Sequence, residues 1–231
     1  MNAGAGLDYA VSERSAIGAD YNYQKTDFER KTSVDSEAHG VRFFYRRRLQ
    51  NQRDVITIFP RFVWGNSDDW DSYNSTLNFR WAHPFSETLD TSITLGARHS
   101  RVNYKDDRDD TDNWGGVDNM WLKKRGELTT GRVGLSNDLQ TRSNGEIVNV
   151  SRFNSNIDHR LSRRFGVGFS GGVWYSNLIE DSPETDDDRW YLDVSPSVFY
   201  RLTEYHILRL VYSYNHQKRL DAEDDDTTDR Q

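Results

Sequence analysis

Arginine recurs on one side of the segments of this chain in which polar and apolar residues alternate. Neighbouring residues of a strand point to opposite faces, so arginines an even number apart, such as Arg42 and Arg46, share a face. Guanidinium groups pair bidentately with anionic groups, and a wall of them focuses a positive potential. The residues expected to line such an anion path are Arg42, Arg46, Arg48, Arg61, Arg80, Arg98, Arg132, Arg152, Arg201 and Arg209.

An internal ion-pair network is the alternative reading of the same arginines. Asp20, Asp158 and Asp193 occupy polar positions of their own alternating segments. If these carboxylates pair with the arginines, the charges stiffen the wall and are not offered to a solute. The sequence leaves both interpretations open.

Aspartate gathers in stretches between the alternating segments and offers oxygen ligands for Ca²⁺ or Mg²⁺. None of these stretches has the glycine and distal glutamate of an EF-hand loop. A loop-bound Ca²⁺, divalent bridging to lipopolysaccharide phosphates and a simply solvated acidic rim all remain open. The candidate ligands are Asp106, Asp107, Asp109, Asp110, Asp186, Asp187 and Asp188.

Enzymatic chemistry finds little support in the residue pattern. His99 and Ser100 are sequence neighbours, as are Asp158 and His159. Neighbours on a strand point to opposite faces, so neither pair can act as nucleophile and base or as base and orienting carboxylate. We expect no enzyme and no cofactor other than the loop-bound Ca²⁺. There is also no basic patch with exposed aromatic residues that would indicate nucleic-acid binding.

Short turns recur about every 38 residues and alternate with longer acidic loops. The turns fall at 12–15, 51–54, 86–89, 125–127, 162–164 and 203–205, and several carry Arg or Lys. The acidic stretches fall at 27–37, 68–71, 106–118, 180–188 and 221–229. Short turns on one side and long loops on the other are the layout of a bacterial outer-membrane β-barrel.

The alternation predicts an all-β, antiparallel up-and-down transmembrane barrel of about twelve strands. The expected strands are 7–12, 16–28, 40–49, 55–65, 72–83, 91–104, 116–123, 128–139, 147–161, 165–178, 190–202 and 207–217. The segment at 116–123 has the weakest pattern, and a change of phase near Val102 suggests a β-bulge. Many segments reach the 9–11 residues or so that cross a bilayer when tilted, which favours a barrel over a soluble sandwich or solenoid.

Composition agrees with a barrel. The chain has 231 residues, a net charge of -7 and no cysteine, so disulfides and thiolate metal sites are excluded. Its mean hydropathy of -0.90 argues against membrane-spanning helices but not against strands, of which only alternate residues meet lipid. No leader sequence is visible. Residues 1–231 are expected to be one domain.

Both chain ends should lie on the acidic, long-loop side, because the first strand runs toward a short turn and the last runs away from one. Complete barrels usually place both ends on the short-turn side. We therefore expect one strand to be missing at each end of a barrel of 14 or more strands. Closure of twelve strands in an unusual orientation is the alternative.

Aromatic residues cluster at both ends of the expected strands and predict two interfacial bands. The band beside the acidic loops comprises Trp64, Trp70, Tyr104, Trp114, Tyr175 and Trp190. The band beside the turns comprises Phe85, Phe165 and Tyr205.

Three phrases at the short turns, at 81–87, 157–163 and 199–204, resemble the hairpins of Gram-negative outer-membrane barrels that carry an Arg-Leu-Ser-Glu-like turn. They are most similar to barrels associated with exopolysaccharide export and exosortase systems. That resemblance implies an outer-membrane location and polysaccharide export, and it carries over no catalytic residue.

The leading functional hypothesis is an outer-membrane, porin-like channel for an anionic solute or an exported polysaccharide. Its expected partners are outer-membrane lipid, lipopolysaccharide and the solute. A structural or adhesive barrel with a plugged lumen and acidic extracellular loops is the alternative. Ion conductance separates the two.

Overall fold

The computed structural model describes residues 1–26, 35–141, 146–179 and 188–219. Within these ranges the regular elements are all strands, and no helix is long and apolar enough to cross a membrane. The strands are β1 (Asn2–Ser12), β2 (Ser15–Thr26), β3 (Ser36–Arg48), β4 (Val55–Ser67), β5 (Trp70–Ser86), β6 (Leu89–Tyr104), β7 (Thr111–Arg125), β8 (Thr129–Thr141), β9 (Ile147–Arg160), β10 (Phe165–Leu178), β11 (Arg189–Arg201), β12 (Ile207–Val211) and β13 (Tyr214–Arg219).

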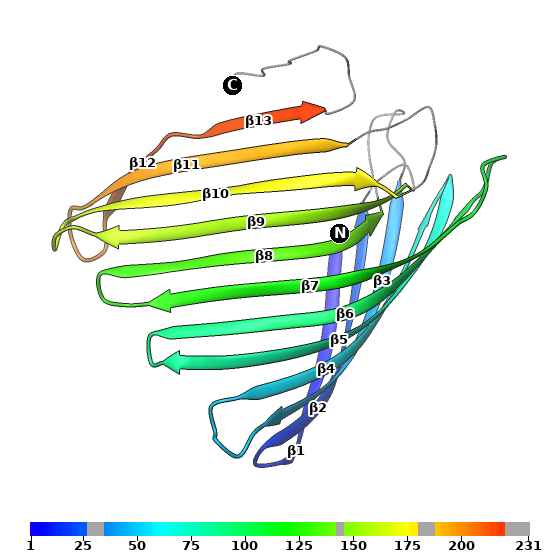
Figure 1. Cartoon of the computed structure of the whole chain (residues 1–231), viewed down its shortest axis with the longest axis horizontal. Coiled ribbons are helices and arrows are strands. Elements are labelled where there is room, and N and C mark those ends of the chain that lie inside the picture. The colour runs from blue at the N-terminus through cyan, green and yellow to red at the C-terminus, as the bar shows by residue number, and fades with distance from the viewer. Residues whose placement is uncertain (27–34, 142–145, 180–187, 220–231) are drawn as a thin grey trace. The chain divides into compact units, whose positions relative to one another are not determined.

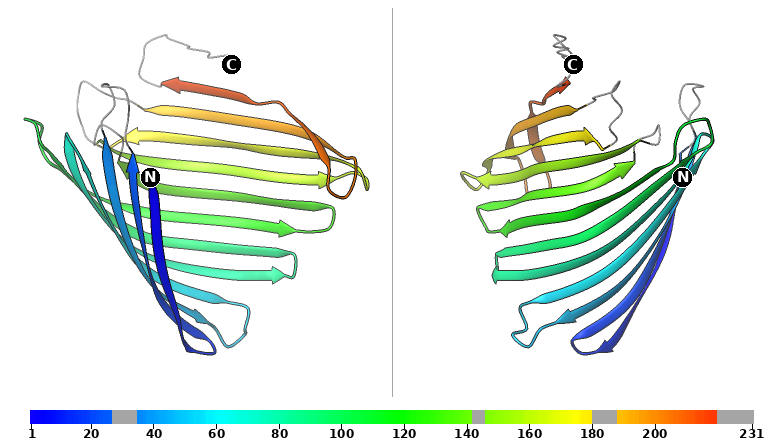
Figure 2. Two further views of the ribbon diagram at one scale, coloured as in Figure 1. Left: turned by 180° about the vertical axis from the view of Figure 1, so that it is seen from behind. Right: turned by 45° about the vertical axis from the view of Figure 1, so that its right-hand side comes forward.

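The strands pair in chain order from β1 to β12, and β13 also pairs with β11. Figure 1 shows this order as neighbouring arrows, and Figure 2 shows the same succession from two other directions. Among the described strands no pairing joins β1 to β12 or β13. The predicted all-β, antiparallel, up-and-down arrangement is confirmed, including the weakly patterned strand that is now β7.

The expected twelfth strand is split into β12 and β13 by a proline in its partner. Both pieces pair with β11 in one uninterrupted register, in which Ser197 lies opposite Val211 and Val194 opposite Tyr214. The same register places Tyr212 opposite Pro196, and the Tyr212 amide donates to the Pro196 carbonyl at 3.1 Å. Proline has no N–H to return this bond, so the ladder breaks there.

Five of the six short turns share a side-chain hydrogen bond that the sequence encodes. Ser12, Ser86, Ser162 and Thr203 each accept the backbone N–H two residues later, at 3.2–3.3 Å. Asn51 does the same for Arg53 at 3.1 Å. Residues with short polar side chains stabilise turns in this way, which explains their position in these turns.

Two acidic stretches are shorter as loops than the sequence suggested. The expected loop at 68–71 is a two-residue connection, because β4 ends at Ser67 and β5 begins at Trp70. The Ser67 hydroxyl accepts the amides of Asp69 and Trp70 and closes this turn locally. The stretch at 106–118 is mostly strand, since β7 begins at Thr111. The stretch at 221–229 lies outside the described residues, as do most of 27–37 and 180–188.

The expected change of phase near Val102 is wrong. Ser100 and Val102 are both wholly buried, and Arg101 between them is exposed. Ser92 and Thr94 are buried on the same alternation. Val102 is therefore an apolar residue on the otherwise polar face of β6. In the hydropathy pattern of the sequence, such a residue looks like a change of phase in the alternation.

Burial in this fold is inverted relative to a soluble protein. Large apolar side chains such as Leu77, Phe79 and Leu95 are exposed on one face of the sheet, whereas Ser72 and Asn78 are buried on the other. We call these the apolar face and the polar face. An exposed apolar face of this extent is what lipid covers in a transmembrane barrel.

The chain divides into two compact units. The first comprises Met1–His83, Ile93–Asp118 and Asp138–Asn149, and the second comprises Pro84–Ser92, Asn119–Asn137 and Val150–Gln231.

Candidate functional site

The register of the first unit places its predicted arginines on one face. Arg42 lies opposite Asp20 on β2 and Arg61 on β4. Arg46 lies opposite Thr57, which in turn lies opposite Arg80. Directly opposed residues share a face, so these side chains all belong to the polar face. Arg48 follows the same alternation two residues after Arg46.

Several of these arginines are engaged by carboxylates of the chain. Arg42 donates through Nε to Asp20 Oδ2 at 2.8 Å, and Arg46 Nη2 lies 3.2 Å from Asp8 Oδ2. In the second unit Arg209 Nη2 lies 3.2 Å from Asp158 Oδ1. The predicted pairing of Asp20 and Asp158 is therefore present. The carboxylate of Asp8 was not expected.

Arg98 is the most completely held arginine of the polar face. Its Nη1 donates to Asp138 at 3.0 Å, its Nη2 to Asn74 at 2.7 Å, and its Nε to Ser100 at 2.9 Å. Its side chain is only 11% exposed. A lysine has no fork of donors with which to reach three acceptors on different strands. Arg98 therefore holds the wall together and offers little charge to a solute.

Aromatic rings support four arginines of the polar face. The distance from the guanidinium carbon to the ring centre is 6.0 Å for Arg46 and Phe44 and 5.0 Å for Arg80 and Phe59. It is 5.1 Å for Arg132 and Trp121 and 5.2 Å for Arg209 and Phe199. These distances are those of cation–π contacts. Stacking fixes the direction of the guanidinium group and leaves its N–H groups able to bind an acceptor.

For Arg48, Arg61, Arg132 and Arg201, no described carboxylate lies within ion-pair distance. Arg132 instead lines a cleft on the polar face of the second unit, together with Arg152. The predicted arginines thus fall into different groups. Arg42, Arg46, Arg98 and Arg209 belong to the internal ion-pair network. The better candidates to meet an anion are Arg48, Arg61, Arg132 and Arg201.

The cleft on strands β8 to β11 is the main feature that the sequence analysis missed. It has a volume of about 440 Å³ and is lined by Arg132 and Arg152 together with Asn154, Asn156, Ser170, Gly172, Trp174 and Asp193, among others. Its volume falls within the roughly 300–1,000 Å³ of small-molecule sites. The signal was available, because Trp174 continues the small, polar side of β10 set by Ser170 and Gly172.

The two predicted aromatic bands occupy the apolar face, with two exceptions. Tyr23, His39, Trp64 and Tyr73 lie opposite one another on β2 to β5, and the His39 and Trp64 rings stack at 5.2 Å. Trp114 stacks on His99 at 4.6 Å.

In the second unit Tyr175 and Trp190 lie opposite each other at a ring distance of 5.1 Å. Phe85 and Phe165 are also exposed, and Tyr205 is exposed in its turn.

Trp70 and Tyr104 do not belong to the apolar face. Trp70 is buried and shares the alternation of Ser72 on β5. Tyr104 shares the alternation of Ser100 and Val102 on β6, and the Arg108 guanidinium lies 4.0 Å from its ring centre. Proximity to an acidic loop was the only signal for these two residues, and it carries no information about the face.

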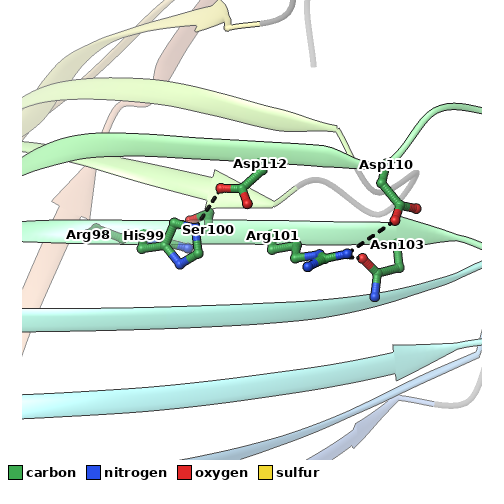
Figure 3. A network of polar contacts seen from close by, with 7 residues as sticks. All are labelled: Arg98, His99, Ser100, Arg101, Asn103, Asp110 and Asp112. Carbon is green, nitrogen blue, oxygen red and sulfur yellow. Dashed lines mark hydrogen bonds and ion pairs between the residues drawn. The ribbon is translucent and has the colours of Figure 1, made fainter.

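Asp106, Asp110 and Asp112, which lie beside β6 and β7, each contact a basic side chain of the chain. Figure 3 shows Arg101 extending toward Asp110, with Nη2 3.5 Å from Oδ2, and His99 Nε2 2.5 Å from Asp112 Oδ1. In the loop, Arg108 Nε donates to both oxygens of Asp106 at 2.9–3.0 Å. This hydrogen bond from Arg108 holds the pKa of the Asp106 carboxyl below its usual value.

Within the described ranges no group of three or more His, Cys, Asp or Glu side chains is placed to hold a metal ion. Asp107 and Asp109 are exposed, and Asp188 accepts a hydrogen bond from the Tyr175 hydroxyl. Asp186 and Asp187 lie outside the described residues. The loop-bound Ca²⁺ therefore stays a prediction.

Histidines find partners across strands, where sequence adjacency gives no information. His83 Nδ1 lies 2.5 Å from Asp54 Oδ1, and His159 Nδ1 lies 2.8 Å from the Thr129 hydroxyl. The hydrogen bond with His83, helped by Asn51, lowers the pKa of the Asp54 carboxyl. These contacts fasten turns and strand ends to their neighbours.

Comparisons with known proteins bear on the fold alone. No family model and no curated protein matches the chain. Among solved structures, the copper transporter OprC matches with a TM-score of 0.64 at 11% identity, over 94% of this chain and 48% of that protein. The alcaligin outer-membrane receptor FauA of Bordetella pertussis matches with a TM-score of 0.42 at 8% identity, over 95% of this chain and 53% of that protein. This chain spans about half the length of either protein.

The fold is that of a transmembrane β-barrel of the bacterial outer membrane. The strand order and the match to OprC define the architecture. Strands β1 to β11 have 11–17 residues, and the sheet carries an exposed apolar face of the kind that lipid covers in a transmembrane barrel. The predicted location in the outer membrane follows from that face and this fold.

Proposed function

We propose that this chain forms part of an outer-membrane channel in which a polar solute passes along the polar face. The observation that carries the proposal is the cleft on β8 to β11, where the polar face is hollowed and lined by arginine, asparagine and aspartate. A face that only packed against an apolar plug would bury such groups at a cost. The proposal includes no enzymatic step.

Anion preference is the finer part of the proposal. Arg48, Arg61, Arg132 and Arg201 face no described carboxylate within ion-pair distance, so their charge is available to a passing anion. Arginines in a pore attract anions and repel cations. An anionic solute or an acidic polysaccharide moving outward is consistent with this lining. Lipid and lipopolysaccharide are the partners that the apolar face calls for.

Single-channel recording in planar bilayers tests this proposal. We expect stepwise conductance that favours chloride over potassium and a shift of the reversal potential toward cation selectivity in Arg61→Ser and Arg132→Ser. Arg101→Ser is the matched control, because Arg101 lies on the apolar face beside Asp110. Unchanged selectivity in both polar-face variants would refute the anion preference. A folded protein that never conducts would refute the channel.

A plugged structural barrel is the second candidate, and one observation favours it. In the first unit Ser100 and Val102 on the polar face of β6 are wholly buried. Side chains so completely covered indicate that this part of the polar face is packed and not wet. The conductance measurement decides between the two candidates.

A further inference from the structure

The cleft on the second unit combines groups that a simple anion does not require. One wall is formed by Trp174 of β10, whose ring stacks on Tyr191 of β11 at a centroid distance of 5.2 Å and an angle of 13°. The two residues are directly opposite in the register and therefore share the polar face. On the apolar face such a pair would belong to the interfacial band. On the polar face it gives the cleft a flat, weakly polar platform.

Asp193 supplies a hydrogen-bond acceptor without a partner. It lines the cleft, and its Oδ1 atom is buried and accepts no hydrogen bond from the described residues. The alternative interpretation of the sequence placed Asp193 in an ion-pair network, but no described cation lies within ion-pair distance of it. A carboxylate that lines the cleft without a cationic partner favours a ligand that brings a hydrogen-bond donor. A fully deprotonated anion such as sulfate has none to bring.

Amide and guanidinium groups complete the polar lining. Asn154 and Asn156 reach the cleft from β9, and Arg132 and Arg152 border it from β8 and β9. Asparagine both donates and accepts, which matches the dual character of a hydroxyl group. Donors and acceptors therefore line the same cleft as the aromatic platform, and a ring-shaped polyol presents both an apolar ring face and hydroxyl groups.

Gly172 keeps the cleft open. A Cβ atom at this position would lie 2.9 Å from the backbone oxygen of Phe153 on β9. That oxygen belongs to the strand ladder and cannot rotate away, so side chains are excluded there and the space beside Trp174 stays free.

We propose that this cleft binds one or two sugar units of a saccharide, with the apolar face of a ring against Trp174 and hydroxyl groups donating to Asp193 and bonding to Asn154 and Asn156. The inference rests on the proposed function, because it places the saccharide on the polar face along which the solute passes. It narrows the solute to hydroxyl-rich compounds. The neutral hydroxyl groups meet the carboxylate, and the arginines accommodate any acidic substituent.

Tryptophan fluorescence of the full chain, refolded in detergent, measures the binding. Maltohexaose and cellohexaose are the neutral probes, an oligogalacturonate is the acidic probe, and sodium sulfate is the free anion. We expect saturable changes with at least one oligosaccharide and none with sulfate. Trp174→Ala should weaken binding at least about tenfold, which corresponds to about 1.4 kcal/mol.

Trp190→Phe is the matched control, because Trp190 lies on the apolar face of β11, away from the cleft. This substitution should leave the affinity within about twofold of the wild type. Folding of each variant is checked by its mobility shift on boiling. If Trp174→Ala does not fold, Asp193→Asn and Asn156→Ala, measured by isothermal titration calorimetry, take its place and should each lower the affinity.

Two patterns would overturn the inference. One is binding of sulfate without binding of any oligosaccharide, and the other is equal affinity in the wild type and every cleft variant. Conductance keeps the two proposals apart. A wild-type protein that conducts but binds none of these saccharides refutes the saccharide site and leaves the channel standing. A protein that binds a saccharide but never conducts refutes the channel alone.

Discussion

Gly166 offers a sharp test of how the polar face is packed. It is buried in β10 directly opposite Phe199 of β11. A Cβ atom at this position would lie 2.6 Å from Phe199 Cε2 and 2.7 Å from the backbone oxygen of His159. The Phe199 ring therefore occupies the space above the glycine, and it also carries the guanidinium group of Arg209 at 5.2 Å.

Replacing Gly166 with alanine should destabilise the barrel. The His159 oxygen is part of the ladder, so the added methyl group must displace a strand as well as the ring, and overpacking of this kind costs about 1–3 kcal/mol. Alanine also lowers the conformational entropy of the unfolded chain relative to glycine, which stabilises the folded state by about 0.4–1 kcal/mol. Gly116→Ala is the matched control, because a Cβ atom there meets nothing within 4 Å and only the favourable part remains.

Both variants share the stabilisation that comes from the lower entropy of the unfolded chain. The difference between their free energies of unfolding therefore isolates the overpacking cost of about 1–3 kcal/mol. With an m-value of about 3 kcal/mol per molar urea, the unfolding midpoints should differ by roughly 0.3–1 M. Tryptophan fluorescence in urea, with the protein in detergent, reads the transition. Equal midpoints, or a Gly166→Ala variant more stable than the wild type, would show that Phe199 does not lie over Gly166.

Three further predictions concern the turns and the arginine network. Gln52 has a positive φ of 57°, so Gln52→Gly should relieve strain. The free energy of unfolding should rise by up to about 1 kcal/mol and the urea midpoint should rise with it, and a lower midpoint would contradict this. The pKa of the Asp54 carboxyl is lowered mainly by its hydrogen bond with His83. The resulting stability is present above the unfolded pKa of about 3.9 and is lost as the pH falls through the lower folded pKa. Asp54→Asn should therefore flatten the pH dependence of the free energy of unfolding below about pH 4, and an unchanged dependence would refute the assignment. Arg98→Lys should cost about 1–3 kcal/mol in the same urea assay, because lysine cannot serve three acceptors at once, and a cost near zero would show that the contacts are not formed.

The architecture was predictable because the sequence of a membrane strand carries two independent signals. Alternation gives the two faces, and short polar turn residues give the strand ends. β10, at Phe165–Leu178, matches its predicted bounds, since Ser162 closes the preceding turn and the alternation runs without a break. The break between β12 and β13 was not predicted. Its cause, Pro196, lies on the partner strand, and the pairing register had to be known first.

The sequence predicted which face of the sheet the arginines occupy, but it did not predict which of them form ion pairs. Alternation assigns Arg42 and Arg98 to the polar face, but ion pairing depends on which residues lie across the sheet. Asp138 lies 40 residues after Arg98 in sequence, and only the fold brings the two together. The cleft was missed for a related reason. Trp174 looks like an ordinary strand aromatic until Tyr191 and Asp193 are placed beside it by the register of β11.

We propose that the polar face meets water and that the apolar face meets lipid. The absence of cysteine from the chain permits a direct test of this division. Ser170 and Phe169 are neighbours on β10, the first lining the cleft and the second exposed on the apolar face. Single variants Ser170→Cys and Phe169→Cys, reconstituted in lipid vesicles, would be treated with a membrane-impermeant maleimide. We predict rapid labelling of Ser170→Cys and protection of Phe169→Cys. Protection of Ser170→Cys together with labelling of Phe169→Cys would contradict the assignment of the two faces and the channel built on it.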